Sequence, residues 1–259
     1  MKAFLGTLVC LVAATISMAE IKTETVEYKQ DGVVLEGYLA YDTAVKGKRP
    51  AVLIVHDWRG VSEYTRMRTE QVAALGYVAL AADVYGKGVR PKNAQEASAE
   101  AAKYYKDRQL LRARLRAGLD YLAGRSEADP SRLAVMGYCF GGGGALELAR
   151  SGAPVKGVVT FHGTLNTLNP ADAKNIKGKV LVLHGADDPY VKPDDVKSFM
   201  DEMRAAGVDW QVVYYSGAVH QFTDKGAGTD NSKGAAYNEA ADRRSWQAMK
   251  DFFAEVLAQ

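Results

Sequence analysis

The chain has 259 residues, of which 47% are hydrophobic and 25% are charged, and its formal net charge is +2. This composition is typical of a globular protein and excludes a disordered chain, a collagen-like repeat and a disulfide-dense miniprotein. The near balance of charge provides no basic field that would hold nucleic acid, and no apolar run reaches the roughly 20 residues needed to span a bilayer.

The first nineteen residues predict a cleavable secretory signal peptide. A basic start at Lys2 precedes a short apolar stretch, and small residues follow at positions 17 and 19. The apolar stretch, Ala3–Ile16, is too short to cross a bilayer, and polar residues resume directly after Ala19. The alternative is a buried N-terminal helix. The signal peptide predicts a periplasmic or secreted protein in which residues 20–259 form a single domain.

Cleavage after Ala19 would remove Cys10 and leave Cys139 as the one cysteine of the mature chain. Disulfides form in the periplasm and outside the cell, but a single cysteine cannot form an internal one. An unpaired thiol in an oxidising compartment is either buried and inert or kept for its chemistry. Cys139 is therefore a candidate functional residue.

Apolar and amphipathic segments alternate along the rest of the chain. Turns are predicted at Gln30-Asp31-Gly32, between the strands of a hairpin, and at Asp129-Pro130-Ser131. In chain order the pattern predicts strands Lys22–Lys29, Val33–Tyr41 and Ala51–Val55, helix Ser62–Leu75, strand Tyr77–Ala82, helices Asn93–Tyr105 and Arg108–Ala123, strand Arg132–Met136, helix Ala145–Arg150, strands Val155–Phe161 and Lys179–Leu183, helix Asp194–Ala206, strand Trp210–Tyr215 and helix Ala240–Leu257.

This alternation predicts an α/β fold with a mostly parallel central sheet and helices on both faces. Right-handed crossovers place the carboxyl ends of the parallel strands at one edge of the sheet, where ligands bind in such folds. Leucines follow one face of the Arg108–Ala123 helix, so Arg112, Arg114 and Arg116 are expected on its solvated side.

One motif carries the chemistry, the run Gly-Tyr-Cys-Phe-Gly-Gly at 137–142 between a predicted strand and a predicted helix. In the pattern Gly-x-nucleophile-x-Gly the chain turns sharply, so that Cys139 projects at a helix N-terminus, where the helix dipole favours a thiolate. The N–H of Phe140 then points to where an oxyanion would form. A phosphate-binding loop would need Lys and Ser/Thr, or a further glycine, at positions where the chain has none. A buried structural cysteine is the remaining alternative.

A nucleophile needs a base and an acid, which follow it along the chain in this architecture. Asp188 comes directly after the strand Lys179–Leu183, and His220 follows the last strand, so both fall at the carboxyl edge of the sheet. His220 could take the thiol proton while Asp188 orients its ring, with Asp187 as the rival acid. Three further histidines, at positions 56, 162 and 184, also end strands. None shows the local spacing of metal ligands, so no metal site is predicted.

Three segments together resemble the dienelactone hydrolase (carboxymethylenebutenolidase) family of the α/β-hydrolase superfamily. They are the run at 137–142, Gly-Ala-Asp-Asp-Pro-Tyr-Val at 185–191 and Ala-Val-His-Gln-Phe at 218–222. The resemblance extends from about Glu24 to Leu257. It implies an α/β-hydrolase fold, a triad of Cys139, Asp188 and His220, and no cofactor.

The segment His-Asp-Trp-Arg-Gly at 56–60 looks like the family's loop after its third strand. By this resemblance Trp58 contributes the second oxyanion N–H, and Asp57 stands where a Glu usually contacts the resting thiol, although it is one methylene shorter. Some family members bind a substrate carboxylate through an arginine just after the His-x-Phe motif. Asp224 follows here, and it would repel an anionic substrate unless Arg59 or Lys225 compensates.

The sequence thus predicts a cysteine-dependent hydrolase of carboxylic ester or lactone bonds, which acts on a small molecule through a thioacyl-enzyme intermediate. A periplasmic carboxylesterase or thioesterase for another acyl substrate shares the same triad. A non-catalytic ligand-binding homologue would keep the fold without turnover. A thiol redox protein is disfavoured because the mature chain has no resolving cysteine.

Overall fold

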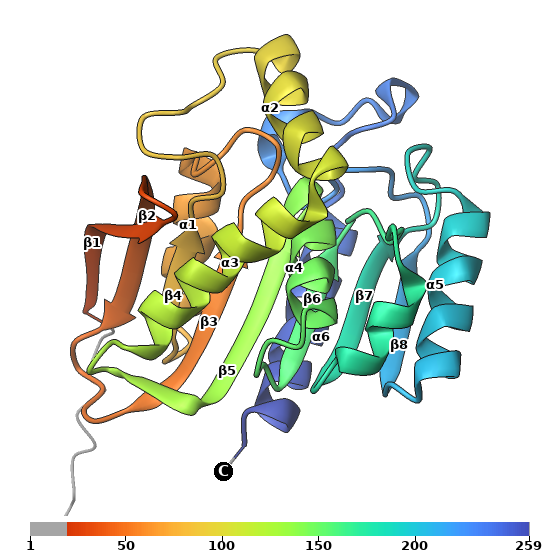
Figure 1. Ribbon diagram of the computed structural model, residues 1–259. Coiled ribbons are helices and arrows are strands. Elements are labelled where there is room, and N and C mark those ends of the chain that lie inside the picture. Colours follow the sequence, from red (N-terminus) through yellow and green to blue (C-terminus); the bar gives the residue numbers. More distant parts are fainter. Residues whose placement is uncertain (1–19, 259) are drawn as a thin grey trace, which may run out of the picture.

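The computed structural model describes residues 20–258, so the predicted signal peptide lies outside the described residues. Eight strands form a single sheet in the order β1-β2-β4-β3-β5-β6-β7-β8 (Figure 1). The first two pairs of neighbours are antiparallel and the remaining pairs are parallel. The strands are β1 (Ile21–Gln30), β2 (Val33–Asp42), β3 (Arg49–Val55), β4 (Val78–Ala82), β5 (Ala128–Tyr138), β6 (Gly157–Phe161), β7 (Lys179–Gly185) and β8 (Trp210–Tyr215).

Helices cover both faces of this sheet, as predicted (Figure 1). They are α1 (Glu63–Ala73), α2 (Ala94–Lys106), α3 (Arg108–Ala123), α4 (Phe140–Arg150), α5 (Pro193–Ala206) and α6 (Glu239–Val256). Buried residues of α2, α3, α4 and α5 belong to one core cluster, and those of α1 and α6 belong to the other. None of the helices within residues 20–258 is long and apolar enough to cross a membrane.

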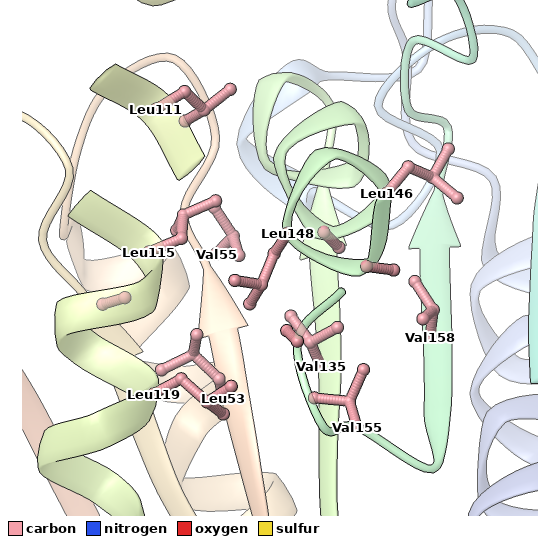
Figure 2. Packing of buried hydrophobic residues seen from close by; sticks show 14 of the residues in the cluster. Leu53, Val55, Leu111, Leu115, Leu119, Val135, Leu146, Leu148, Val155 and Val158 are labelled. Carbon is pink, nitrogen blue, oxygen red and sulfur yellow. The ribbon is translucent and has the colours of Figure 1, made fainter. Parts of the chain in front are cut away.

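The central strands are apolar on both sides because each side has its own core. In β3, Leu53 and Val55 face α3 and α4 (Figure 2). Val52 and Ile54 belong to the cluster under α1 and α6. Successive side chains of a strand point to opposite faces, so a strand between two helical layers needs an unbroken apolar run. The carboxyl ends of β3 and β5 lie side by side, with Val55 paired to Gly137.

The structure confirms every predicted strand and helix, with end shifts of a few residues in most of them. The hairpin turn at Asp31 and Gly32 has positive φ at both residues, as its sequence predicts. The turn predicted at Asp129-Pro130-Ser131 lies inside β5, where the pairing with β3 shifts register. Three short 3-10 helices were not predicted: Pro170–Asn175, Lys225–Ala227 and Asn231–Lys233.

Two of the three arginines expected on the solvated side of α3 are not solvated. Arg112 is paired with Glu147 of α4 and with Asp172, and Arg114 is buried. Only Arg116, which pairs with Asp120 one turn along the helix, matches the prediction. The guanidinium of Arg112 finds its partners on neighbouring elements, which the helix sequence alone does not show.

The helix after the glycine-rich bend begins at Phe140, five residues before the predicted Ala145. The glycines that suggested a bend lie inside the helix instead. Their lack of a side chain allows this part of the helix to pack closely against the end of β3. A Cβ at Gly141 would lie 2.2 Å from the carbonyl oxygen of Val55 and 2.4 Å from that of His56. The first turn of α4 is therefore pressed against the backbone at the end of β3, which glycine alone permits.

Candidate active site

Cys139 occupies the tight bend between β5 and α4. Its φ of 55° and ψ of −116° are strained for a residue with a side chain. The bend is held by the Cys139 N–H, which donates to the carbonyl of Phe161 at 3.1 Å, and by the Cys139 carbonyl, which accepts from Gly142 N–H at 3.0 Å. The side chain is only partly buried, so the thiol is not sealed in the core.

The structure brings together the three side chains predicted to act in sequence. The Sγ of Cys139 is 3.0 Å from Nε2 of His220, and Nδ1 of His220 is 2.7 Å from Oδ2 of Asp188. The other oxygen of Asp188 accepts the N–H groups of Tyr190 at 2.8 Å and Val191 at 3.3 Å. Both the carboxylate and the imidazole are buried. The rival acid, Asp187, is exposed to solvent.

The charge balance of this array favours a protonated imidazole. Burial alone would lower the pKa of His220, but the adjacent Cys139 sulfur and the Asp188 carboxylate outweigh burial and raise that pKa to about 10. These two contacts therefore favour the protonated form of the ring. An imidazolium 3.0 Å from the sulfur is the arrangement that supports a cysteine nucleophile.

Two aromatic residues for which the sequence predicted no role beside His220 flank its ring. His162 and Tyr190 each contact it edge-on, with ring centroids 5.2 Å and 5.3 Å away. His162 is buried, its Nε2 is 2.8 Å from the Thr223 hydroxyl, and burial holds its pKa well below the ordinary value. Its φ of 40° is also strained. The position of His162 at the end of a strand could be predicted from the sequence. Its strained backbone conformation, which marks it as unusual, could not.

The two predicted oxyanion donors lie on neighbouring segments. Phe140 is the first residue of α4, and Trp58 follows β3, whose end is adjacent to that of β5. Within residues 20–258, no hydrogen bond to a protein acceptor is found for the N–H of either Phe140 or Trp58. Both amides are thus available to an oxygen atom placed near the thiol.

Among the described residues no hydrogen bond joins Asp57 to the Cys139 thiol, and Asp57 has other partners. Its buried carboxylate accepts the Arg59 N–H at 2.7 Å and forms an ion pair with the Arg59 guanidinium at 2.7 Å. The same guanidinium reaches Asp224 at 2.6 Å, so Arg59 joins the loop after β3 to the loop after His220. Arg59 therefore neutralises the acid at position 224, which is one of the two compensations that the sequence suggested.

The other histidines predicted at strand ends do not form a metal site with these residues. In the part of the chain that the structure describes, no group of three or more His, Cys, Asp or Glu side chains could hold a metal ion. A cavity of about 790 Å³ adjoins Arg59, Thr223 and Asp224, but Cys139 is not among its lining residues. The Cys139 sulfur thus lies outside this cavity.

Comparisons with known proteins agree on the kind of protein. A family model described as "Dienelactone hydrolase family" matches residues 35–257. A Salmonella typhimurium protein named "Putative carboxymethylenebutenolidase" is 30% identical over 85% of this chain and 83% of its own length. The crystal structure of a dienelactone hydrolase-like promiscuous phosphotriesterase, P91 from metagenomic libraries, has a TM-score of 0.88 and 41% identity, and the match covers 92% of this chain and 99% of that one.

A more distant likeness concerns the fold alone. The acylaminoacyl peptidase of Pyrococcus horikoshii has a TM-score of 0.70 and 14% identity, and the match covers 92% of this chain and 42% of the peptidase. The sheet order and the helical layers are therefore those of an α/β-hydrolase fold.

Proposed function

Because the chain belongs to the dienelactone hydrolase family, we propose that it hydrolyses carboxylic ester or lactone bonds with Cys139 as the nucleophile. The observation that carries this proposal is the contact of 3.0 Å between Sγ of Cys139 and Nε2 of His220, backed by Asp188 at 2.7 Å. This is the geometry of a nucleophile, a base and an orienting acid. The substrate is a small molecule, and no cofactor takes part.

The reaction follows from the positions of these groups. The Cys139 sulfur, with its proton on His220, attacks the carbonyl carbon, and the carbonyl π electrons move onto oxygen. The N–H groups of Phe140 and Trp58 stabilise that oxyanion, each by about 3 kcal/mol. The intermediate expels the alkoxide, which takes the proton from His220, and leaves a thioacyl enzyme. Water then gives a proton to His220 and attacks the thioester, and the sulfur leaves as the acid is released.

The charges around the proposed oxyanion loop favour neutral esters. Arg59 is a cation within that loop, and its guanidinium already binds the carboxylates of Asp57 and Asp224. A substrate carboxylate would have to compete with both. We therefore expect a neutral ester such as p-nitrophenyl acetate to react better than an anionic one such as mono-p-nitrophenyl succinate.

A second candidate activity is the hydrolysis of phosphotriesters. The P91 structure, at 41% identity, is described as that of a dienelactone hydrolase-like promiscuous phosphotriesterase, and it overlays nearly the whole chain. Attack of the Cys139 sulfur on phosphorus would place negative charge on a phosphoryl oxygen and expel an aryloxide, which takes the proton from His220. The same two N–H groups would stabilise the phosphoryl oxygen. Water, deprotonated by His220, would then attack phosphorus and release the sulfur with a phosphodiester as product.

The test compares wild type, Cys139→Ala and iodoacetamide-treated protein on p-nitrophenyl acetate, dienelactone and a p-nitrophenyl phosphotriester. Ester turnover should be lost in the variant and in the alkylated protein. Turnover that survives Cys139→Ala would rule out the nucleophile. A wild type that binds esters without cleaving them would instead favour the non-catalytic homologue.

Asp224→Asn tests the substrate charge in the same assay. Releasing Arg59 from one carboxylate should shift the ratio of kcat/KM toward the anionic ester by about five- to tenfold. Asp201→Asn, which removes an exposed carboxylate on α5, is the control with the same change in net charge. If the ratio of kcat/KM values for the two esters is unchanged in Asp224→Asn, Arg59 does not contribute to the preference for neutral substrates.

The place of action that we propose is the periplasm or the exterior of the cell. This part of the proposal is supported by the sequence of residues 1–19, with its basic start, apolar middle and small residues before position 20.

A further inference from the structure

His56, at the end of β3, is a completely buried histidine that the reaction above does not use. Its ring lies between two aromatic rings, stacked on Phe140 with centroids 5.9 Å apart and edge-on to Tyr85 at 4.7 Å. Phe140 supplies one of the two proposed oxyanion amides. His56 therefore packs against the side chain of a residue that supplies one of these amides.

The hydrogen bonds of His56 define its tautomer. Nε2 accepts the N–H of Val84 at 3.2 Å, because a backbone N–H can only donate. Nδ1 is 2.5 Å from the carbonyl oxygen of Asp57, which can only accept, so Nδ1 carries the proton. Burial lowers the pKa of His56, which keeps the ring neutral with one donor and one acceptor.

The carbonyl that His56 holds belongs to the peptide whose N–H is the proposed oxyanion donor. No cis peptide occurs in the described chain, so the Asp57 carbonyl and the Trp58 N–H point in opposite directions. The Asp57 carbonyl also accepts the Gly60 N–H at 3.3 Å. Two donors thus fix the carbonyl end of this peptide, and thereby the direction of its N–H.

The peptide after Trp58 is held at both of its ends. The Tyr85 hydroxyl donates to the Trp58 carbonyl at 2.9 Å, and the next N–H, that of Arg59, is taken by the Asp57 carboxylate at 2.7 Å. Of the N–H groups of residues 58–60, those of Arg59 and Gly60 have acceptors within the described chain, and that of Trp58 has none. The loop therefore presents a single amide outward.

We propose that His56 is a positioning residue of the oxyanion hole, which orients and polarises the Asp57–Trp58 peptide so that the Trp58 N–H is held ready for the developing oxyanion. A hydrogen bond to a peptide carbonyl strengthens the N–H of the same peptide as a donor. The inference deepens the proposed ester hydrolysis and rests on it. His56 does not touch substrate and acts only through this peptide.

The experiment compares His56→Asn with His56→Phe. Asparagine can place an N–H near the position of Nδ1, whereas phenylalanine keeps the ring volume and the stacking without a donor. Neither variant can accept the hydrogen bond from the Val84 N–H. The loss of stability from that bond is therefore the same in both. For p-nitrophenyl acetate we expect kcat to fall on the order of 10- to 100-fold in His56→Phe, to recover largely in His56→Asn, and KM to change little.

Alkylation of Cys139 shows whether a variant has lost only the oxyanion hole or has also disturbed the thiol. Iodoacetamide alkylates Cys139 by displacing iodide from carbon, and no carbonyl oxygen gains charge in that step. Its second-order rate constant should stay within about twofold of wild type in both variants. A fall in alkylation that matches the fall in kcat, or a kcat in His56→Phe equal to wild type, would overturn the assignment.

Two further measurements keep the inference testable if His56→Phe does not fold. Trifluoroacetophenone adds a thiol to give a charged tetrahedral adduct, so its inhibition constant should rise in parallel with the loss of kcat. Tyr85→Phe removes the donor to the Trp58 carbonyl and should lower kcat several-fold. Tyr215→Phe, which removes a buried hydroxyl with no partner among the described residues, is the matched control. Equal kcat values for the two tyrosine variants would contradict the inference.

The outcomes also separate this inference from the proposed function. A wild type that cleaves no ester, or a Cys139→Ala variant that still does, overturns both. An active, Cys139-dependent wild type whose His56 variants lose kcat equally, with asparagine no better than phenylalanine, overturns the positioning role alone.

Discussion

Backbone strain is concentrated around the proposed nucleophile. Four residues other than glycine have positive φ in the described chain, and Cys139, His162 and Gln221 are three of them. Each such conformation costs on the order of 1–3 kcal/mol and persists only where neighbouring contacts hold it. At Cys139 those contacts are the Phe161 carbonyl and the first turn of α4. The strain keeps the sulfur aimed at His220 before any substrate arrives.

The raised pKa of His220 predicts an alkaline limit to turnover. The ring should keep its proton through neutral pH and lose it at about pH 10, after which the leaving alkoxide has no proton donor. The contribution of His220 to the free energy of unfolding is likewise lost at alkaline pH. Because the folded pKa lies above the unfolded value of about 6.5, the contribution of this group is full below that pH and is lost as pH rises through about 10.

Asp188→Asn should move that limit downward. Removing the carboxylate removes one of the groups that raise the pKa of His220, so the pKa falls toward its ordinary value. We expect kcat to fall by 10²- to 10⁴-fold, on the order seen when the acid of a triad is neutralised. A titration of the His220 ring nitrogens by ¹⁵N NMR measures the shift directly. A pKa unchanged by the substitution would show that Asp188 does not support the charge on His220.

Among the elements, α4 shows how the candidate site depends on close packing. Glycines in a helix interior cost stability, yet α4 begins with a run of four, Gly141–Gly144. Sequence propensity therefore predicted a bend, and tertiary packing overrode it. At Gly141 the nearest atoms are backbone carbonyls of β3 and His56, whereas at Gly144 they are ends of the Val55 and Leu115 side chains.

Gly141→Ala and Gly144→Ala should separate these two situations. A Cβ at 141 would lie 2.2 Å from a backbone oxygen, so the helix start must move; we expect a loss of about 1–3 kcal/mol in the free energy of unfolding and a lower kcat. At 144 the contacts begin at 3.2 Å, and a gain in helix propensity offsets them. Urea unfolding and ester turnover measure both effects. Equal stability of the two variants would contradict this account of the glycines.

The elements and the site differ in how far the sequence predicts them. Strands such as Ala51–Val55 are predictable because burial on both faces demands an unbroken apolar run. The meeting of the loops that carry residues 139, 188 and 220 is predictable because each follows a parallel strand, and such strands end at one edge. The choice of Asp188 over Asp187 came from the resemblance to the family. The ion pairs of Asp57 and Arg112 are not, because each charged group chooses its partner from loops and helices that only folding brings near.

At the scale of the whole molecule, a buried charge network joins the helical layer on one face. Arg150 is completely buried and reaches Glu147 at 3.1 Å and Glu202 of α5 at 2.7 Å, while Glu147 also binds Arg112 of α3. Three helices are thus linked by paired charges beneath the surface. Removing one partner would leave an uncompensated buried charge, which is far more costly than losing an exposed pair.

Export of the whole chain can be tested directly. If residues 1–19 act as a signal peptide, expression of the full chain in a Gram-negative host should yield a periplasmic protein whose N-terminal residue is Glu20. Intact-mass spectrometry of the periplasmic fraction identifies that end. Ala19→Phe, which places a large side chain before the cleavage point, should leave the longer species uncut. A full-length wild-type protein in the cytosol would contradict the prediction.

The proposed machinery is spread over loops that follow β3, β5, β7 and β8 in the sheet. A ribosome makes the Trp58 amide first and the His220 imidazole last, 81 positions after Cys139. Until the loop after β8 is made and docks, the Cys139 thiol therefore lacks its imidazole partner. If the chain hydrolyses esters as proposed, the unfinished polypeptide is inactive toward them.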